Sequence, residues 1–339
     1  AYDPLPIEML ELFKGCPLEK RNIINNRTTQ NLLFCMKAAD FILCASERQK
    51  DLWTGILLSL GKITPELYDR DPTLSSLIGI VPFGIPSDPC VKTGPGLKEK
   101  LHFRDKDKLF LWGGGIWNWF DPLSLIKAVA KLREKRDDIH LVFMGLKHPN
   151  DNIPAMQMTQ DAIQLAKDLK MTDRAVHFNF NWVPYDERQN TLLESTAGVS
   201  MHFNNTETRY AFRTRLLDCL YAKLPIIATE GDYFSDLIER KKLGLVVKPQ
   251  DVDGIANAMC TLSDDQGLCE AFRRNIGALR TDYTWENAVQ PIVSFLSTHR
   301  YKPTRLGLMP YIHFSTAFIK EKGFSGVAKT LLKKLIPSK

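Results

Sequence analysis

The sequence predicts an α/β fold built on parallel β-sheets. From residue 109 onward, short apolar runs alternate with amphipathic stretches, and each apolar run is continuous. Strands that are buried on both faces of a parallel sheet show such continuous runs, and strands that alternate with helices form βαβ units. With 339 residues, 44% of them hydrophobic, the chain is long enough for two domains with buried cores.

The alternation defines an ordered series of elements. We expect strands at 109–112, 139–144, 175–178, 199–203, 226–228 and 243–247, with helices at 123–132, 158–169, around 192–193 and at 216–221. Parallel sheets of this kind bind ligands outside the carboxyl ends of their strands. Ligand-binding residues are therefore expected directly after these strands.

The N-terminal part predicts only the last portion of a second Rossmann-like domain. A strand at 41–45, a helix at 47–60 and a strand at 78–81 continue the pattern, whereas residues 1–40 supply no further strands. The Pro- and Gly-rich stretch 82–96 is typical of an interdomain linker. We expect three parts: a truncated domain with linker at 1–95, a main domain at 96–299 and a tail at 300–339.

Composition limits the classes of protein that fit. Seven cysteines without a C-x-x-C pair indicate buried thiols in a reducing cytoplasm, rather than a disulfide framework or zinc site. No apolar run is long enough to cross a bilayer, and the N-terminus does not look like a signal peptide. The net charge is +6, but the tail alone holds nine Lys and Arg against one Glu. Because aromatic and aliphatic residues are interleaved there, the tail is either a membrane-surface segment or a packed helix with a solvated cationic face.

The first candidate motif follows the strand at 109–112. Gly113, Gly114 and Gly115 lead through Trp117, Asn118 and Trp119 to a helix with Pro122 in its first turn. Glycines between a strand and a helix N-terminus let backbone N–H groups approach a phosphate. The motif matches neither G-x-G-x-x-G nor the P-loop pattern, which argues against NAD binding and ATP hydrolysis. A tight turn packed by the two tryptophans is the alternative.

The second candidate motif is Asn205 to Asp218. Polar residues at a strand end precede a helix whose first turn is predicted to hold Arg213 and Arg215, which makes an anion site. The Asp218 carboxylate can accept hydrogen bonds from a ribose diol, and Glu207 can do the same for sugar hydroxyls. The alternative is a surface helix with an Arg215–Asp218 charge pair. Asp69 and Asp71 are predicted in a loop before Pro72, where we expect solvated turn residues and no metal site. His140, His177 and His202 are expected in or beside the sheet core.

Taken together, these stretches resemble the donor-binding domain of retaining GT-B glycosyltransferases, in particular a bacterial branch that builds cell-surface polysaccharides. The resemblance is carried by ADFILCASERQ (39–49), IVPFGIP (80–86), the glycine turn, FRTRLLD (212–218), KLPIIAT (223–229) and the Gly231-Asp232 pair. It implies a GT-B fold of two Rossmann-like domains, the N-terminal one truncated here.

The resemblance also implies roles for individual residues. Asp218 takes the place of the second glutamate of the E-x7-E motif, which binds the ribose, and Glu207 matches the residue that holds the donor hexose. The spacing between them is longer than in that motif, and Trp117, Asn118 and Trp119 replace the family's usual Arg and Lys. Arg213 is predicted to supply the diphosphate charge instead, so Glu207 and Arg213 form the predicted catalytic set. The predicted substrate-binding set is Gly113, Gly114, Gly115, Asn118, Trp182, Val183, Tyr210, Phe212, Arg215 and Asp218, with the base near 180–184.

The implied function is transfer of a sugar from a nucleotide-diphosphate sugar to a glycan or lipid-linked acceptor, with retention and without a metal or other cofactor. The expected location is the cytoplasm, with the tail at the inner face of the cell membrane, and no nucleic-acid partner is expected. Two alternatives stay open: a non-catalytic nucleotide-sugar-binding or scaffold domain, and a GT-B-like sugar epimerase, whose acid–base set is not found in the sequence.

Overall fold

A computed structural model describes residues 1–146 and 156–298, so the tail predicted at 300–339 lies outside the described residues. The described chain forms two compact units, residues 1–81 with 291–298, and residues 82–290. The predicted linker packs within the second unit, where the Ile85 amide donates to the Tyr283 carbonyl at 2.8 Å and the Thr93 amide to Asn190 Oδ1 at 2.7 Å. The boundary therefore lies after Val81 rather than at residue 95. Among these residues, no helix combines the length and apolar character needed to cross a membrane.

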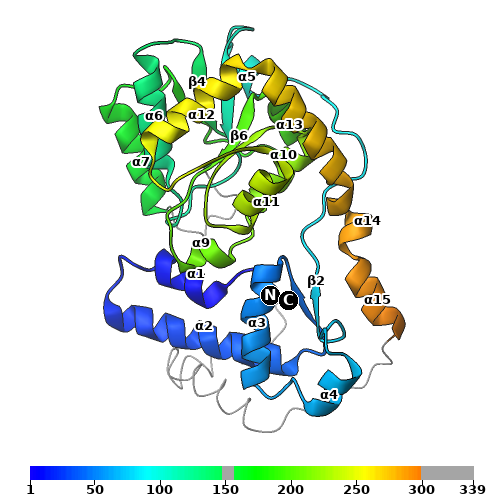
Figure 1. The fold of residues 1–339 in the computed structure, drawn as a ribbon. Helices are drawn as coiled ribbons and strands as arrows, with labels where there is room; N and C mark the ends of the chain where they lie inside the picture. The colour runs from blue at the N-terminus through cyan, green and yellow to red at the C-terminus, as the bar shows by residue number, and fades with distance from the viewer. Residues whose placement is uncertain (147–155, 299–339) are drawn as a thin grey trace, which may run out of the picture. The chain divides into compact units, whose positions relative to one another are not determined.

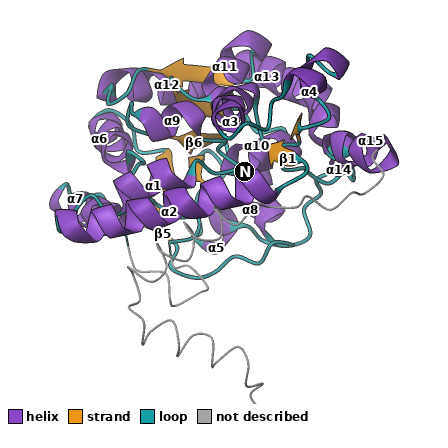
Figure 2. Cartoon of the chain, turned by 90° about the horizontal axis from the view of Figure 1, so that it is seen from below, coloured by secondary structure: helices purple, strands orange, loops and turns teal. Residues whose placement is uncertain are grey.

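The first unit holds a two-stranded parallel sheet surrounded by helices. Its elements are α1 (Leu5–Leu12), α2 (Leu18–Ala38), β1 (Ile42–Cys44), α3 (Glu47–Ser59), α4 (Pro65–Arg70), β2 (Ile78–Ile80) and α15 (Gln290–Thr298). Strand β1 pairs with β2, with Ile42 opposite Ile78. Helix α1 lies along α2 (Figure 2). The predicted β–α–β segment is confirmed, and residues 1–40 form helices and add no strand.

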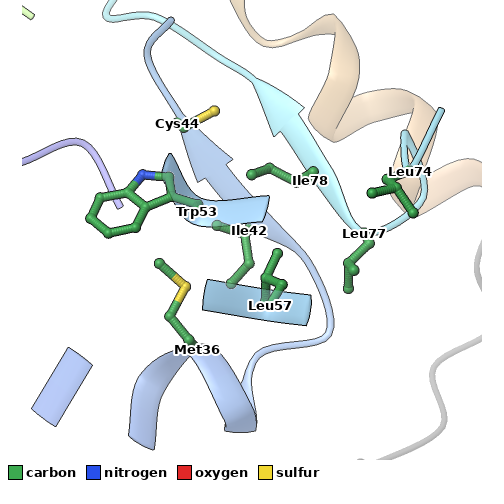
Figure 3. Packing of buried hydrophobic residues seen from close by; sticks show 8 residues of the cluster. All are labelled: Met36, Ile42, Cys44, Trp53, Leu57, Leu74, Leu77 and Ile78. Atoms are coloured by element: carbon green, nitrogen blue, oxygen red, sulfur yellow. The ribbon is translucent and has the colours of Figure 1, made fainter. Parts of the chain in front are cut away.

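A small apolar core holds this unit together (Figure 3). Met36, Trp53 and Leu57 pack with residues from both strands, and the Trp53 side chain is only 1% exposed. Ser46 is the N-cap of α3. Its hydroxyl accepts a hydrogen bond from the Gln49 amide, which satisfies one free N–H of the first turn. Burial of Trp53 and Leu57 fixes α3 against the sheet and so completes the β–α–β segment.

The second unit contains a six-stranded, all-parallel sheet in the order β5-β4-β3-β6-β7-β8. Its strands are β3 (Lys108–Trp112), β4 (Ile139–Phe143), β5 (Val176–Phe178), β6 (Ala197–Ser200), β7 (Ile226–Thr229) and β8 (Gly244–Val247). Every predicted strand of this domain is present, although β6 begins and ends earlier than expected. The predicted α/β class with parallel sheets is therefore confirmed.

Helices precede, connect and follow these strands along the chain (Figure 1). They are α5 (Leu97–Lys100), α6 (Pro122–Arg133), α7 (Gln157–Asp168), α8 (Arg188–Glu194), α9 (Thr206–Tyr210), α10 (Arg215–Ala222), α11 (Tyr233–Lys241), α12 (Val252–Asp264), α13 (Gln266–Leu279), the 3₁₀ helix η1 (Arg280–Tyr283) and α14 (Trp285–Ala288). Helix α6 contacts α7 and α12, whereas α10 contacts α8 and α13. Asp121 caps α6 by accepting from the Ser124 amide, and Pro122 occupies its first turn as predicted.

The strand order places a topological switch point between β3 and β6. The chain runs outward from β3 to β4 and β5, then returns to lay β6 against the other side of β3. At such a point the connections leave in opposite directions, which opens a crevice at the carboxyl ends of the strands. The glycine turn follows β3, and the segment with Glu207, Arg213, Arg215 and Asp218 follows β6. Both candidate motifs therefore lie at the switch point.

The core of this unit contains a buried histidine pair at the start of β4 and β5. His140 Nδ1 and His177 Nε2 share a hydrogen bond of 3.1 Å, and the Phe103 ring lies 4.3 Å from His140 and 4.8 Å from His177, centroid to centroid. Burial lowers the pKa of His177 to about 4. The expectation that these histidines are core residues is confirmed.

This pair predicts loss of stability at mildly acid pH. The unfolded chain binds a proton at His177 near pH 6.5, whereas the folded chain does not until about pH 4. The free energy of unfolding is therefore expected to fall by about 2 kcal/mol from pH 8 to pH 5 through this residue alone. In His177→Gln, denaturant unfolding should show a correspondingly smaller fall. The exposed control is His102→Asn, because asparagine tolerates the positive φ of that position. Equal pH dependence in wild type and His177→Gln would contradict the assignment.

Candidate functional site

A cavity of about 700 Å³ opens within the second unit at the switch point. The predicted site residues that line it are Gly113, Gly114, Gly115, Trp182, Val183, Arg215 and Asp218. Other lining residues come from the ends of β4 and β5, from the start of α7, and from residues 83–85 and Trp285. The volume lies in the range of small-molecule sites, so the cavity is the candidate binding site.

The glycine turn after β3 forms one wall of the cavity. Gly114 has a φ of +98°, which glycine adopts without strain. A Cβ added at Gly113 or Gly115 would meet no atom of the described chain within 4 Å, whereas one added at Gly198 would collide with the Cys219 side chain. Packing therefore explains the glycine at 198 but not those at 113 and 115. Their backbones face open space that a ligand can approach closely.

Two tryptophans flank this turn, as the packing alternative required. The rings of Trp117 and Trp119 stack with centroids 5.3 Å apart and an interplanar angle of 5°. Trp119 is buried, while Trp117 also lines the cavity. The tryptophans thus support the turn without filling the space beside its glycines.

Arg215 brings a positive charge to the cavity beside this turn. Its Nη2 donates a 2.8 Å hydrogen bond to the Gly115 carbonyl, and its guanidinium lies 4.0 Å from the Phe120 ring centroid. Among the described residues no carboxylate pairs with Arg215, and its buried Nη1 has no hydrogen-bond partner. Burial, with the nearby Arg213 charge, lowers the pKa of Arg215 to about 9. The arrangement is an uncompensated cation held beside a glycine turn, which attracts an anion.

Asp218 lies one helical turn further along α10. One of its oxygens, Oδ1, lies 3.0 Å from Arg188 Nη2, and burial raises the pKa of Asp218 to about 6 although Arg188 lowers it. The alternative pairing of Asp218 with Arg215 is not seen. A carboxylate that lines a cavity and is costly to ionise is a candidate for ligand binding.

Glu207 and Arg213 do not line the cavity. Both side chains are buried, and Arg213 Nη1 and Nη2 donate to the two Glu207 carboxylate oxygens at 2.8 Å each. Asp232 Oδ2 lies 3.6 Å from Arg213 Nε and 3.3 Å from His202 Nε2. Helix α10 begins at Arg215, so the prediction that Arg213 lies in its first turn is wrong. The ion pair holds Arg213 in the loop before the helix.

Three other predicted residues also lie outside the cavity lining. Asn118 Oδ1 accepts a hydrogen bond from the Met158 amide at 3.3 Å, at the start of α7. The Phe212 ring packs 4.9 Å from that of Phe234, and Tyr210 ends α9. The predicted turn role of Asp71 is confirmed, since its carboxylate accepts from Thr73 and from the Ser76 amide, whereas Asp69 lies in α4 and not in a loop. In residues 1–146 and 156–298, no three His, Cys, Asp or Glu side chains cluster as a metal site.

Sequence reasoning missed part of the lining. Tyr185 and Arg188 lie just beyond the predicted base region at 180–184, and Arg188 looks like an ordinary surface charge beside Glu187. Only its proximity to Asp218, thirty positions away in the chain, reveals its place. Apolar lining residues such as Met144 and Met156 are indistinguishable by sequence from core residues.

The fold and the position of the cavity define an α/β protein with a Rossmann-like parallel sheet. The chain belongs to the family described as glycosyl transferases group 1, whose model matches residues 96–277. A probable sucrose-phosphate synthase from Solanum tuberosum is 30% identical over 159 residues, which are 45% of this chain and 14% of that protein. The chain therefore spans about a seventh of the length of this curated relative.

Solved structures show the same fold at low sequence identity. HepE from Anabaena, in complex with UDP and glucose, has a TM-score of 0.60 and 16% identity, with 82% of this chain and 68% of that chain covered. The sucrose-phosphate synthase from Thermosynechococcus elongatus has a TM-score of 0.57 and 15% identity, with 87% and 66% covered. The predicted GT-B fold is confirmed, and the described part of the first unit contributes the two strands β1 and β2 to it.

The buried Glu207–Arg213 pair predicts a strong effect on stability. Arg213→Ala leaves the Glu207 carboxylate buried without its cation, so we expect the free energy of unfolding to fall by about 3–5 kcal/mol. The matched control is Arg273→Ala, which removes an exposed partner of Glu270 and should change stability by less than about 0.5 kcal/mol. Denaturant unfolding at pH 8 measures both. If the two variants were equally stable, Arg213 would not hold this pair in solution.

Proposed function

We propose that this chain binds a nucleotide-diphosphate sugar in the switch-point cavity and transfers its sugar to a glycan or lipid-linked acceptor. Membership of the glycosyl transferases group 1 family supports the class of reaction. The donor is proposed because the cavity combines an open glycine turn, a cation and a carboxylate. Retention of configuration, and a role in cell-surface polysaccharide synthesis, are proposed from the resemblance described above.

The single observation that carries the proposal is Arg215. Arg215 is half-buried and its Nη1 is buried, and holding such a cation without a counter-ion costs free energy unless a ligand brings a negative charge. The cation faces Gly113 and Gly115, where no protein atom occupies the place of a Cβ. A diphosphate supplies the charge and fits close to exposed backbone. Arg215 therefore replaces Arg213 as the proposed diphosphate ligand.

The other residues that line the cavity are proposed to orient the donor. Asp218 is proposed to accept the ribose hydroxyls, and the base is proposed to lie near Trp182 and Val183. The proposed catalytic roles of Glu207 and Arg213 are indirect, because their buried pair holds the loop that leads to Arg215. Fixed positive groups that stabilise a leaving diphosphate lower the barrier by preorganisation, and we propose that this transfer needs no metal ion.

We also propose a cytoplasmic location and an anionic membrane surface as a partner of this chain. The expected cytoplasmic site, with attachment to an anionic membrane surface, depends on the basic residues of 300–339, which lie outside the described part of the chain. The alternatives are a non-catalytic binding or scaffold domain and a sugar epimerase. HepE was solved with UDP-glucose, so UDP and UDP-glucose are suitable first probes, alongside the corresponding ADP and GDP compounds.

Calorimetric titration with UDP, ADP and GDP tests the site. Arg215→Gln removes a charge-assisted hydrogen bond of ~1.5–3 kcal/mol, so we expect the Kd of the bound diphosphate to rise by about one to two decades. Gly113→Ala is expected to weaken binding at an unchanged melting temperature, because its Cβ meets only the ligand. Gly15→Ala, also in open space but in the first unit, is the control. Titrations in EDTA and in Mg²⁺ should give the same Kd if no metal is required.

The products distinguish the three functions. Slow release of free sugar from the bound nucleotide sugar, accelerated by an acceptor, supports a transferase. An epimerised nucleotide sugar would indicate the epimerase, and binding without turnover would indicate the non-catalytic domain. No binding of any of the three diphosphates, or equal affinity in wild type and Arg215→Gln, would refute the proposed site.

A further inference from the structure

Arg188 begins α8 and lines the same cavity as Asp218. Its guanidinium carbon lies 3.4 Å from the centroid of the Tyr185 ring, and its Nη2 lies 3.0 Å from Asp218 Oδ1. Only 15% of the Arg188 side chain and 21% of the Asp218 side chain are exposed. The three residues thus form a stacked, ion-paired unit, which we call the Arg188 clamp.

The clamp supplies the cation that faces Asp218. Arg188 is the only described cation in an ion pair with this carboxylate. Other ionisable groups also lie near Asp218. Cys219 follows it on α10, Arg215 lies one turn earlier on that helix, and Cys90 interacts with Asp218, Arg188 and Arg280. Burial opposes ionisation of Asp218, and Arg188 is the cation that counters it. Removing Arg188 therefore leaves a buried carboxyl group that favours its protonated form.

We propose that Arg188 is a positioning residue that holds the Asp218 carboxylate ionised and oriented for the ribose of the donor, with Tyr185 fixing the guanidinium. This inference depends on the function proposed above. Arg188 Nη2 lies against Oδ1, and Oδ2 is the oxygen that we assign to accept a hydroxyl hydrogen. A protonated or reoriented carboxyl group is a poorer acceptor. Arg188 thereby sets both the preference for ribose over deoxyribose and the lower pH limit of binding.

Positioning of Asp218 and direct contact with the diphosphate are two different roles for Arg188, and they have different effects on nucleotide binding. A cation that bonds only the diphosphate strengthens binding of ribo- and 2′-deoxyribonucleotides alike. A cation that acts through Asp218 strengthens binding only where a 2′-hydroxyl is present to donate. The ratio of the Kd of a 2′-deoxyribonucleoside diphosphate to that of its ribonucleotide therefore reports the positioning role.

The experiment measures this ratio with UDP and dUDP, and with the ADP and GDP pairs, from pH 5.5 to 8.5. In wild type the ratio is expected to fall by about tenfold as the pH drops through the region near 6 where Asp218 is protonated. In Arg188→Gln the same fall should be centred at least about one pH unit higher. In Asp218→Asn the ratio should be low at every pH, and Arg188→Lys, which keeps the charge but not the planar stack, should lie between wild type and Arg188→Gln.

Arg273→Gln, an exposed arginine paired with Glu270, is the matched control and should follow the wild-type curve. Wild-type curves in both Arg188 variants, or equal weakening of ribo- and deoxyribonucleotides without a shift in pH dependence, would overturn the inference and leave the proposed function intact. Absence of nucleotide binding by the wild-type chain would instead be a failure of the proposed function. Arg188→Lys keeps the test decisive if Arg188→Gln does not fold.

Discussion

The candidate site depends on one constraint, the placing of an uncompensated cation at the switch point of the sheet. Arg215 is held there by the Gly115 carbonyl and by the Phe120 ring, neither of which neutralises its charge. The adjacent Arg213 is fully compensated by Glu207. Two arginines separated by a single residue thus have different physical roles, because one faces a buried carboxylate and the other faces a cavity.

The glycine turn and the buried network are complementary parts of this arrangement. Gly113 and Gly115 leave open space in the cavity, while the Glu207–Arg213 pair and Asp232 hold the loop that leads to Arg215 beside this turn. A flexible loop would let Arg215 move into solvent, where water would satisfy its charge. Rigid placement keeps the cation poorly solvated, and a poorly solvated cation interacts more strongly with an anion.

Sequence periodicity predicted the strands and most helices, because buried parallel strands have a strong apolar signal at residues such as 109–112 and 226–228. The glycine turn, Arg215 and Asp218 were candidates from their residue types after strands and from the family resemblance, and all of them line the cavity. Periodicity did not predict Arg188, whose role depends on a contact thirty residues away, or the pairing of Glu207 with Arg213, which draws Arg213 out of the helix. The apolar pattern of a segment predicts which of its residues are buried. It does not predict ion pairs, because these depend on which helices and strands pack against each other. The domain boundary was misplaced for the same reason, since 82–95 packs through contacts with Asn190 and Tyr283.

Burial shifts the pKa values of the two ionisable groups proposed to bind the ligand, Arg215 and Asp218, toward their neutral forms. Burial lowers the pKa of Arg215 to about 9 and raises that of Asp218 to about 6, so each charge is disfavoured in the cavity as it stands. An anion beside Arg215 and hydroxyl donors beside Asp218 would remove both penalties, and a nucleoside diphosphate carries these two groups a few bonds apart. Binding of such a ligand to the folded state alone stabilises the fold in proportion to the logarithm of its concentration. Arg215 and Asp218 would therefore make the stability of the second unit respond to the proposed ligand.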